Sequence, residues 1–122
     1  AQLIPGLDGA IVVTTPQEVA LLDSRKAVNM FLMMNVPMLG IVENMSGLVC
    51  PHCGQRIEVF KTGGGENAAR ELGVPFLGAI PLDTEIGRLG DLGKTFANKD
   101  TAAARSFEGI VKSIQAQLEG KP

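Results

Sequence analysis

Two cysteines and one histidine, close together, are the side chains of this sequence best suited to metal binding or redox chemistry. They form the run Cys50-Pro51-His52-Cys53, and the 122-residue chain has no other cysteine or histidine. Thiolates at this spacing can bind one soft metal centre, and Pro51 favours the turn that brings the two sulfurs together. A tetrahedral site needs four ligands, whereas one copy of this run offers three at most. The run is therefore either a redox-active thiol pair or one half of a metal site.

The residues that follow Cys53 favour the half-site. In thiol oxidoreductases the first cysteine lies at a helix N-terminus, which lowers its pKa. Residues 54–60 instead alternate in the manner of an extended hairpin arm, as in zinc ribbons and other metal-binding knuckles. A shared metal or cluster site is thus the main interpretation. A zinc knuckle that binds a protein partner, a thiol oxidoreductase and incidental thiols are the alternatives. We expect His52 to be a solvated turn residue rather than a ligand.

Two glycine-containing motifs resemble phosphate-binding loops, but both lack the required context. Gly93-Lys94-Thr95 supplies the end of a Walker A motif, yet position 88 is Arg and no buried strand leads into it. Gly63-x-Gly65-x-x-Ala68 fits the dinucleotide fingerprint, yet the strand before it would be short and polar. We therefore predict no functional phosphate loop in this chain.

Hydrophobic patterning predicts an α/β fold with three parallel strands. Short apolar runs, of the kind found in strands buried on both faces, occur at 10–14, 38–43 and 76–80. Helices are predicted over 17–35, 63–72 and 101–118, the second one closed by Gly73. Strands joined by a crossover helix are parallel, so we expect a three-layer parallel sheet with flanking helices. Such sheets bind ligands at the carboxyl ends of their strands, which here are 14–15, 43–44 and 81–83.

The same reading of the sequence pattern predicts several local features. Thr15 can cap the first helix. The apolar residues of that helix recur at helical spacing, and its methionines are most simply explained as core packing; the residues are Val19, Leu22, Ala27, Met30, Met33 and Met34. Residues 44–56 are predicted to form a loop that carries the cysteines, and 83–100 a polar stretch.

Composition excludes several functional classes. The chain has a net charge of −2, no basic stripe and only 4% aromatic residues, so nucleic-acid binding is not expected. The most apolar window, 27–42, is interrupted by Asn29, Asn35, Pro37 and Gly40, which argues against a membrane span. The first residues do not resemble a signal peptide, and two cysteines in one motif cannot form a disulfide framework. We expect a reducing, cytoplasmic compartment.

Five motifs in fixed order resemble one known family. They are TTPQEVAL at 14–21, GIVENMS at 40–46, CPHCG at 50–54, GGGE at 63–66 and IPLD at 80–83. Together they resemble the C-terminal half of the Mrp/ApbC family, whose members are P-loop ATPases of the SIMIBI type that carry iron–sulfur clusters. The resemblance covers nearly the whole chain. It implies that residues 1–122 form a single partial domain from which the Walker A half and the switch residues are absent.

The resemblance also implies a function and a set of site residues. Cys50 and Cys53 would hold a [4Fe–4S] cluster that bridges a homodimer, with zinc as the alternative metal. Asn44 would hydrogen-bond the adenine of ATP, and Pro81, Leu82 and Asp83 would border the base, with Mg²⁺ bound in the full-length protein. Apo iron–sulfur proteins would receive the cluster. The resemblance places no catalytic residue in this chain.

Overall fold

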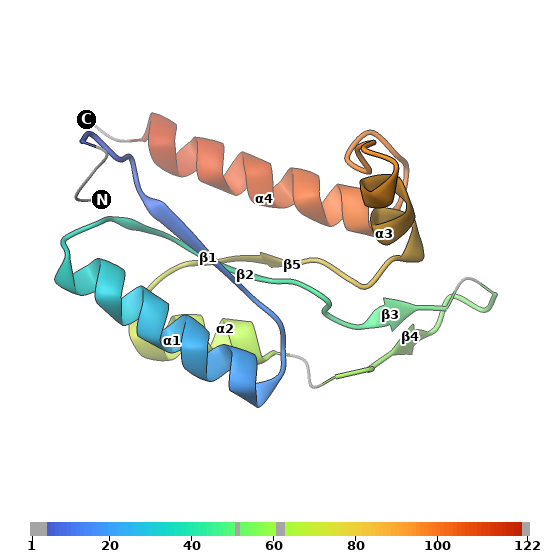
Figure 1. The fold of residues 1–122 in the computed structure, drawn as a ribbon, viewed down its shortest axis with the longest axis horizontal. Coiled ribbons are helices and arrows are strands. Elements are labelled where there is room, and N and C mark those ends of the chain that lie inside the picture. The colour runs from blue at the N-terminus through green and yellow to red at the C-terminus, as the bar shows by residue number, and fades with distance from the viewer. Residues whose placement is uncertain (1–4, 51, 61–62, 121–122) are drawn as a thin grey trace.

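The fold of this chain is a parallel sheet between two layers of helices. The computed structural model describes residues 5–50, 52–60 and 63–120. Three parallel strands, β1 (Ala10–Thr14), β2 (Met38–Glu43) and β5 (Phe76–Ala79), form the sheet in the order β1-β2-β5. Helices α1 (Glu18–Met33) and α2 (Gly64–Leu72) cover one face, and α4 (Ala102–Glu119) covers the other (Figure 1). The predicted fold class and the predicted parallel strands are confirmed.

The central strand β2 is buried on both faces, as its apolar sequence predicts. Because side chains alternate along a strand, Ile41 and Val42 point to opposite faces of the sheet. Ile41 packs with residues of α1 and α2, whereas Val42 packs with Leu77 of β5 and Ile110 of α4. Each face of the sheet therefore has its own apolar cluster, and β2 belongs to both.

The edge strand β1 is covered on one face only, contrary to the prediction. Val12 is buried under α1, whereas Ile11 and Val13, which point to the opposite face, are 39% and 60% exposed. The reason is the position of α4, which packs over β5 and β2 and does not extend over β1. An apolar strip on β1 is thus left uncovered.

Helix α1 turns a different face to the sheet from the predicted one. Leu21 and Val28 are buried in the core, while Met30 and Met33 are 50% and 84% exposed. The core role predicted for these two methionines is therefore wrong, and Val19 and Leu22 are also exposed. Two apolar stripes run along this helix, and spacing within the helix cannot decide which of them faces the sheet.

Two local predictions at helix starts are also corrected. Gln17 is the N-cap of α1 and makes no side-chain capping bond, while Thr15 Oγ1 donates to Gln17 Oε1 at 3.1 Å instead. The predicted polar stretch contains a further helix, α3 (Thr84–Asp91), which Asp83 caps. Glycines at 87 and 90 lower the intrinsic helix propensity of this segment, which explains why its sequence does not read as a helix.

The predicted loop after β2, residues 44–56, contains the first strand and the turn of a β-hairpin. Strands β3 (Leu48–Val49) and β4 (Arg56–Ile57) pair antiparallel, with Leu48 opposite Ile57 and Val49 opposite Arg56. The hairpin projects from the end of the sheet at which β2 ends (Figure 1). The extended arm predicted over residues 54–60 is confirmed in part, because only Arg56 and Ile57 of it form a strand.

Candidate functional site

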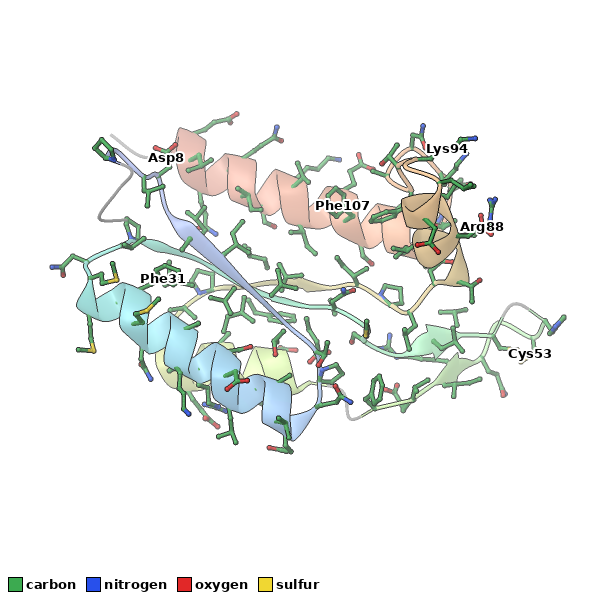
Figure 2. All side chains as sticks on the ribbon, in the orientation of Figure 1. Asp8, Phe31, Cys53, Arg88, Lys94 and Phe107 are labelled. Atoms are coloured by element: carbon green, nitrogen blue, oxygen red, sulfur yellow. The ribbon has the colours of Figure 1, made fainter. Side chains whose placement is uncertain are left out.

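The cysteines lie in the turn of the hairpin formed by β3 and β4. The backbone N–H of Cys50 donates to the carbonyl of Gln55 at 2.9 Å, and the N–H of Gly54 donates to the carbonyl of Cys50 at 2.9 Å. Gly54 has a φ of +75°, which a glycine adopts without strain. Cys53 is exposed at the far end of the hairpin (Figure 2), and Cys50 is half-buried. The sequence thus folds locally into a compact knuckle that presents two sulfurs.

The backbone of this knuckle favours the thiolate form of Cys50. The N–H group of Cys53 and, to a lesser degree, that of His52 hydrogen-bond the Cys50 sulfur and lower the pKa of this thiol below its ordinary value. The Cys53 side chain contributes in the same direction. The thiolate is the form of cysteine that binds metals and attacks disulfides, so the lowered pKa suits either kind of chemistry.

The surroundings of the knuckle help to distinguish a metal site from the active site of a thiol oxidoreductase. His52 is exposed in the turn, as predicted. No three His, Cys, Asp or Glu side chains gather into a metal site within residues 5–50, 52–60 and 63–120. The segment after Cys53 is a β-strand rather than a helix, so Cys50 lacks the helix N-terminus that activates the thiol of an oxidoreductase.

Asn44 lies directly after β2, where the carboxyl ends of the strands meet. Its backbone N–H donates to the carbonyl of Thr14 at 2.7 Å, which holds it beside the end of β1. Its side-chain oxygen accepts the N–H of Met45 at 2.9 Å. The side-chain NH2 group of Asn44 has no hydrogen-bond partner in the described part of the chain, so this donor is available to a ligand.

The segment after β5 runs alongside the loop that carries Asn44. Ser46 donates its N–H to the carbonyl of Ile80 at 2.9 Å, and Leu82 donates its N–H to the carbonyl of Gly47 at 2.7 Å. Asp83 follows, and its side chain accepts the N–H of Glu85 at 2.9 Å to cap α3. The structure therefore brings the four predicted base-contacting residues to one end of the sheet, and it also gives Asp83 a structural role.

A cavity of about 520 Å³ opens beside this segment. Pro81, Leu82 and Asp83 form one wall, β3 forms another, and the start of α4 with the residues before it closes the third, at 100–103 and Arg105. Asn44 is not among its lining residues. The α4 wall escaped the sequence analysis, because it lies close to Pro81 only in three dimensions. The cavity reaches Val49, the residue before Cys50, so the two candidate sites are neighbours.

The glycine motifs have other roles in this structure. Gly65 donates its N–H to the Glu43 carboxylate at 2.9 Å, so a protein side chain occupies the start of α2. Gly93 and Lys94 follow the C-terminus of α3, where Lys94 donates its N–H to the carbonyl of Leu89. Gly93 and Lys94 follow a helix rather than a strand, and the strand before Gly63 is β4, which belongs to the hairpin and not to the parallel sheet.

Glu43 and Ser46 form a buried polar pair that the sequence analysis missed. They are 1% and 2% exposed, and the Ser46 hydroxyl donates to Glu43 Oε2 at 2.6 Å. Since buried carboxylates are costly unless they are hydrogen-bonded, these contacts explain how Glu43 fits at the end of an apolar strand. A charged residue within such a strand is the sequence signal that could have found the pair.

A parallel sheet between helices, with candidate ligand residues at the strand ends, is the architecture of the P-loop NTPase class. A family model described as ParA, NUBPL iron-transfer P-loop NTPase, matches residues 1–115. The chain is 51% identical over 120 residues to an iron-sulfur cluster carrier protein of Methanocaldococcus jannaschii, covering 98% of this chain and 41% of that relative. It is also 51% identical over 114 residues to the Pyrococcus furiosus protein of that name, covering 93% and 39%.

This chain belongs to the NUBPL iron-transfer P-loop NTPase family, which confirms the resemblance found in the sequence. It spans about two fifths of the length of the curated relatives that it matches. Within the described residues, no helix is both long enough and apolar enough to cross a membrane.

Solved structures agree with this assignment. A nucleotide-binding protein of Archaeoglobus fulgidus, solved in complex with ADP, is 39% identical with a TM-score of 0.63, and the match covers 71% of this chain and 36% of that one. The cell division ATPase MinD of Pyrococcus furiosus is 22% identical with a TM-score of 0.68, covering 90% and 43%. At that level of identity, the MinD likeness concerns the fold alone.

Proposed function

We propose that the protein containing this chain is an iron–sulfur cluster carrier, and that Cys50 and Cys53 supply half of the ligands for its cargo. The observation that carries the proposal is the pair of free thiols in the hairpin turn, Cys53 exposed and Cys50 half-buried, beside which the described residues gather no third ligand. Two such pairs, from two copies in a homodimer, supply the four thiolates that a [4Fe–4S] cluster requires. Apo iron–sulfur proteins of the cytoplasm are the recipients.

The same proposal treats residues 1–122 as the C-terminal half of a P-loop NTPase domain, with the Walker A half elsewhere in the protein. The uncovered face of β1, with Ile11 and Val13 exposed, supports this view. Monomeric proteins rarely leave such apolar surface uncovered next to an unpaired strand edge. We infer that further strands and helices of the same protein pack against β1.

ATP with Mg²⁺ is the proposed nucleotide of the full-length protein. The free amide of Asn44 suits the adenine edge, and Pro81, Leu82 and Asp83 border the base from the neighbouring segment. Pro81, Leu82 and Asp83 also line the adjoining cavity between β3 and the start of α4, whereas Asn44 lies outside it. Nucleotide bound there would lie next to the hairpin that carries the cysteines.

Anaerobic reconstitution of the full-length protein with iron and sulfide tests the cargo. A broad visible absorption band with about four iron atoms per dimer is expected. A colourless product with one zinc per two copies would instead establish the zinc knuckle. A product with no metal and a reversible Cys50–Cys53 disulfide would establish the thiol oxidoreductase.

Replacement of Asn44 by alanine is expected to weaken ATP binding by the full-length protein by about tenfold, as for the loss of one or two hydrogen bonds. The amide is the only part of the proposed base contact that this change removes. Calorimetric titration with ATP measures the effect, and exposed Asn98, in the loop before α4, provides a matched control in Asn98→Ala. Equal affinities of Asn44→Ala and the unmodified protein would contradict the assignment of Asn44.

A further inference from the structure

We propose that Arg56 is a positioning residue that fastens the cysteine hairpin to the loop after β2. The inference rests on the proposed cargo site and adds the residue that fixes its geometry. Arg56 lies in β4, the arm that follows Cys53, and its guanidinium reaches back to Ser46 and Gly47 at the carboxyl end of the sheet. These residues come two and three positions after the candidate base-binding residue Asn44.

The contacts of Arg56 are specific. Its Nη2 donates to the Ser46 carbonyl at 2.9 Å and lies 3.4 Å from the Ser46 hydroxyl oxygen, while its Nε donates to Glu58 Oε1 at 2.8 Å. The guanidinium also packs closely on Gly47, because a Cβ added at Gly47 would stand 2.9 Å from both Nε and Nη2. A side chain at position 47 would thus displace Arg56 from its acceptor.

Ser46, which accepts the hydrogen bond from Arg56, is itself held in a fixed position. Ser46 is 2% exposed and donates its hydroxyl to Glu43, and Glu43 accepts the N–H of Gly65 at the start of α2. Buried side chains held by hydrogen bonds in this way occupy one defined geometry. Arg56 therefore ties the hairpin to the sheet and, through Glu43, to α2.

The hairpin needs such a stabilising contact with the rest of the fold because it is short. Its strands have two residues each, and isolated two-stranded hairpins are marginally stable in water. The first arm, which leads to Cys50, is attached to the sheet by the bridge between Leu48 and Leu82. The second arm, which carries Cys53, is exposed along β4 and reaches the sheet through Arg56. The two arms are joined to each other by the β3–β4 pairing and by the turn hydrogen bonds of Cys50. Arg56 thereby fixes the hairpin as a whole, and with it the two sulfurs in its turn, relative to the end of the sheet.

Hydrogen exchange of the unloaded full-length protein tests the inference without the cargo. In Arg56→Gln, amides of 48–57 are expected to exchange at least about fivefold faster, because the half-exposed charged hydrogen bond to Ser46 is lost. Exchange in α4 should not change. Arg70→Gln is the matched control, since Arg70 is an exposed ion-paired arginine of α2 far from the hairpin. Unchanged exchange in 48–57 of Arg56→Gln would overturn the inference.

Transfer of iron to a chelator from the reconstituted protein provides the second measurement. Arg56→Gln is expected to release iron about fivefold faster than the unmodified protein, and Arg56→Lys, which keeps a charged donor, to release it at an intermediate rate. The thermal midpoints of the variants should agree. Equal release from Arg56→Gln and Arg70→Gln would overturn the positioning role. If the unmodified protein takes up no cluster, the proposed function fails, while hydrogen exchange still decides the role of Arg56.

Discussion

Replacement of Cys50 or Cys53 by serine is expected to abolish cluster retention by the full-length protein. In the proposed site, shared by two copies, each change removes two of four thiolates, and the loss should exceed the roughly 100-fold that residues behind the ligands can contribute to metal affinity. The iron content after anaerobic reconstitution and desalting measures it. The thermal unfolding midpoint should barely move, because the hairpin turn lies outside both apolar clusters of the sheet.

The histidine between the two cysteines provides the matched control. His52 is exposed in the same turn, and His52→Ala is expected to retain the full iron content. A protein in which His52 was essential and one cysteine dispensable would not bind its cargo through four symmetric thiolates. The model of two identical half-sites would then be wrong.

Replacement of Glu43 by alanine is expected to lower the free energy of unfolding by about 3 kcal/mol. The change leaves a cavity at a site that is 1% exposed, and it deprives the Ser46 hydroxyl and the Gly65 N–H of their partner. Glu43→Gln should cost about 1 kcal/mol or less, because its amide can accept from Gly65 and donate to Ser46. Urea denaturation of the full-length protein measures both values.

An exposed glutamate of α4 serves as the control for this prediction. The Glu108 side chain is 65% exposed and pairs only with Lys112 of its own helix among the described residues. Glu108→Ala should therefore change the free energy of unfolding by no more than about 0.5 kcal/mol. If Glu43→Ala proved as mild as Glu108→Ala, the polar pair would not hold the end of β2 in place.

The main elements of this fold could be predicted because their signals are local. Continuous apolar runs gave β1, β2 and β5 nearly to the residue, and Gly73, with its φ of +72°, ends α2 as predicted. The run from Cys50 to Cys53 could also be recognised from the sequence as a candidate metal or redox site, because the number and spacing of thiols do not depend on the rest of the fold. The helix α3 was missed because its glycines lower its helix propensity, whereas the capping bond of Asp83 and the burial of Leu89 favour it in the folded chain.

The candidate site depends more strongly on tertiary structure. That Asn44 and Pro81 lie at the same end of the sheet could be predicted, because parallel strands share one carboxyl edge. The cavity wall at the start of α4 and the contact between Arg56 and Ser46 could not, because they join residues whose side chains carry no local signal of a partner.

The sequence by itself determined the ligand count on which the proposed half-site rests: two thiols in one short run, with too few ligands beside them for a complete centre. It also determined the succession of β1, α1, β2, α2, β5 and α4, because alternation and helical periodicity follow from backbone geometry alone. Only the tertiary structure decided which stripe of α1 is buried, which face of β1 stays uncovered, and how the hairpin is fastened to the sheet. These features depend on which surfaces meet in space, and burial selects among apolar surfaces that the sequence presents equally.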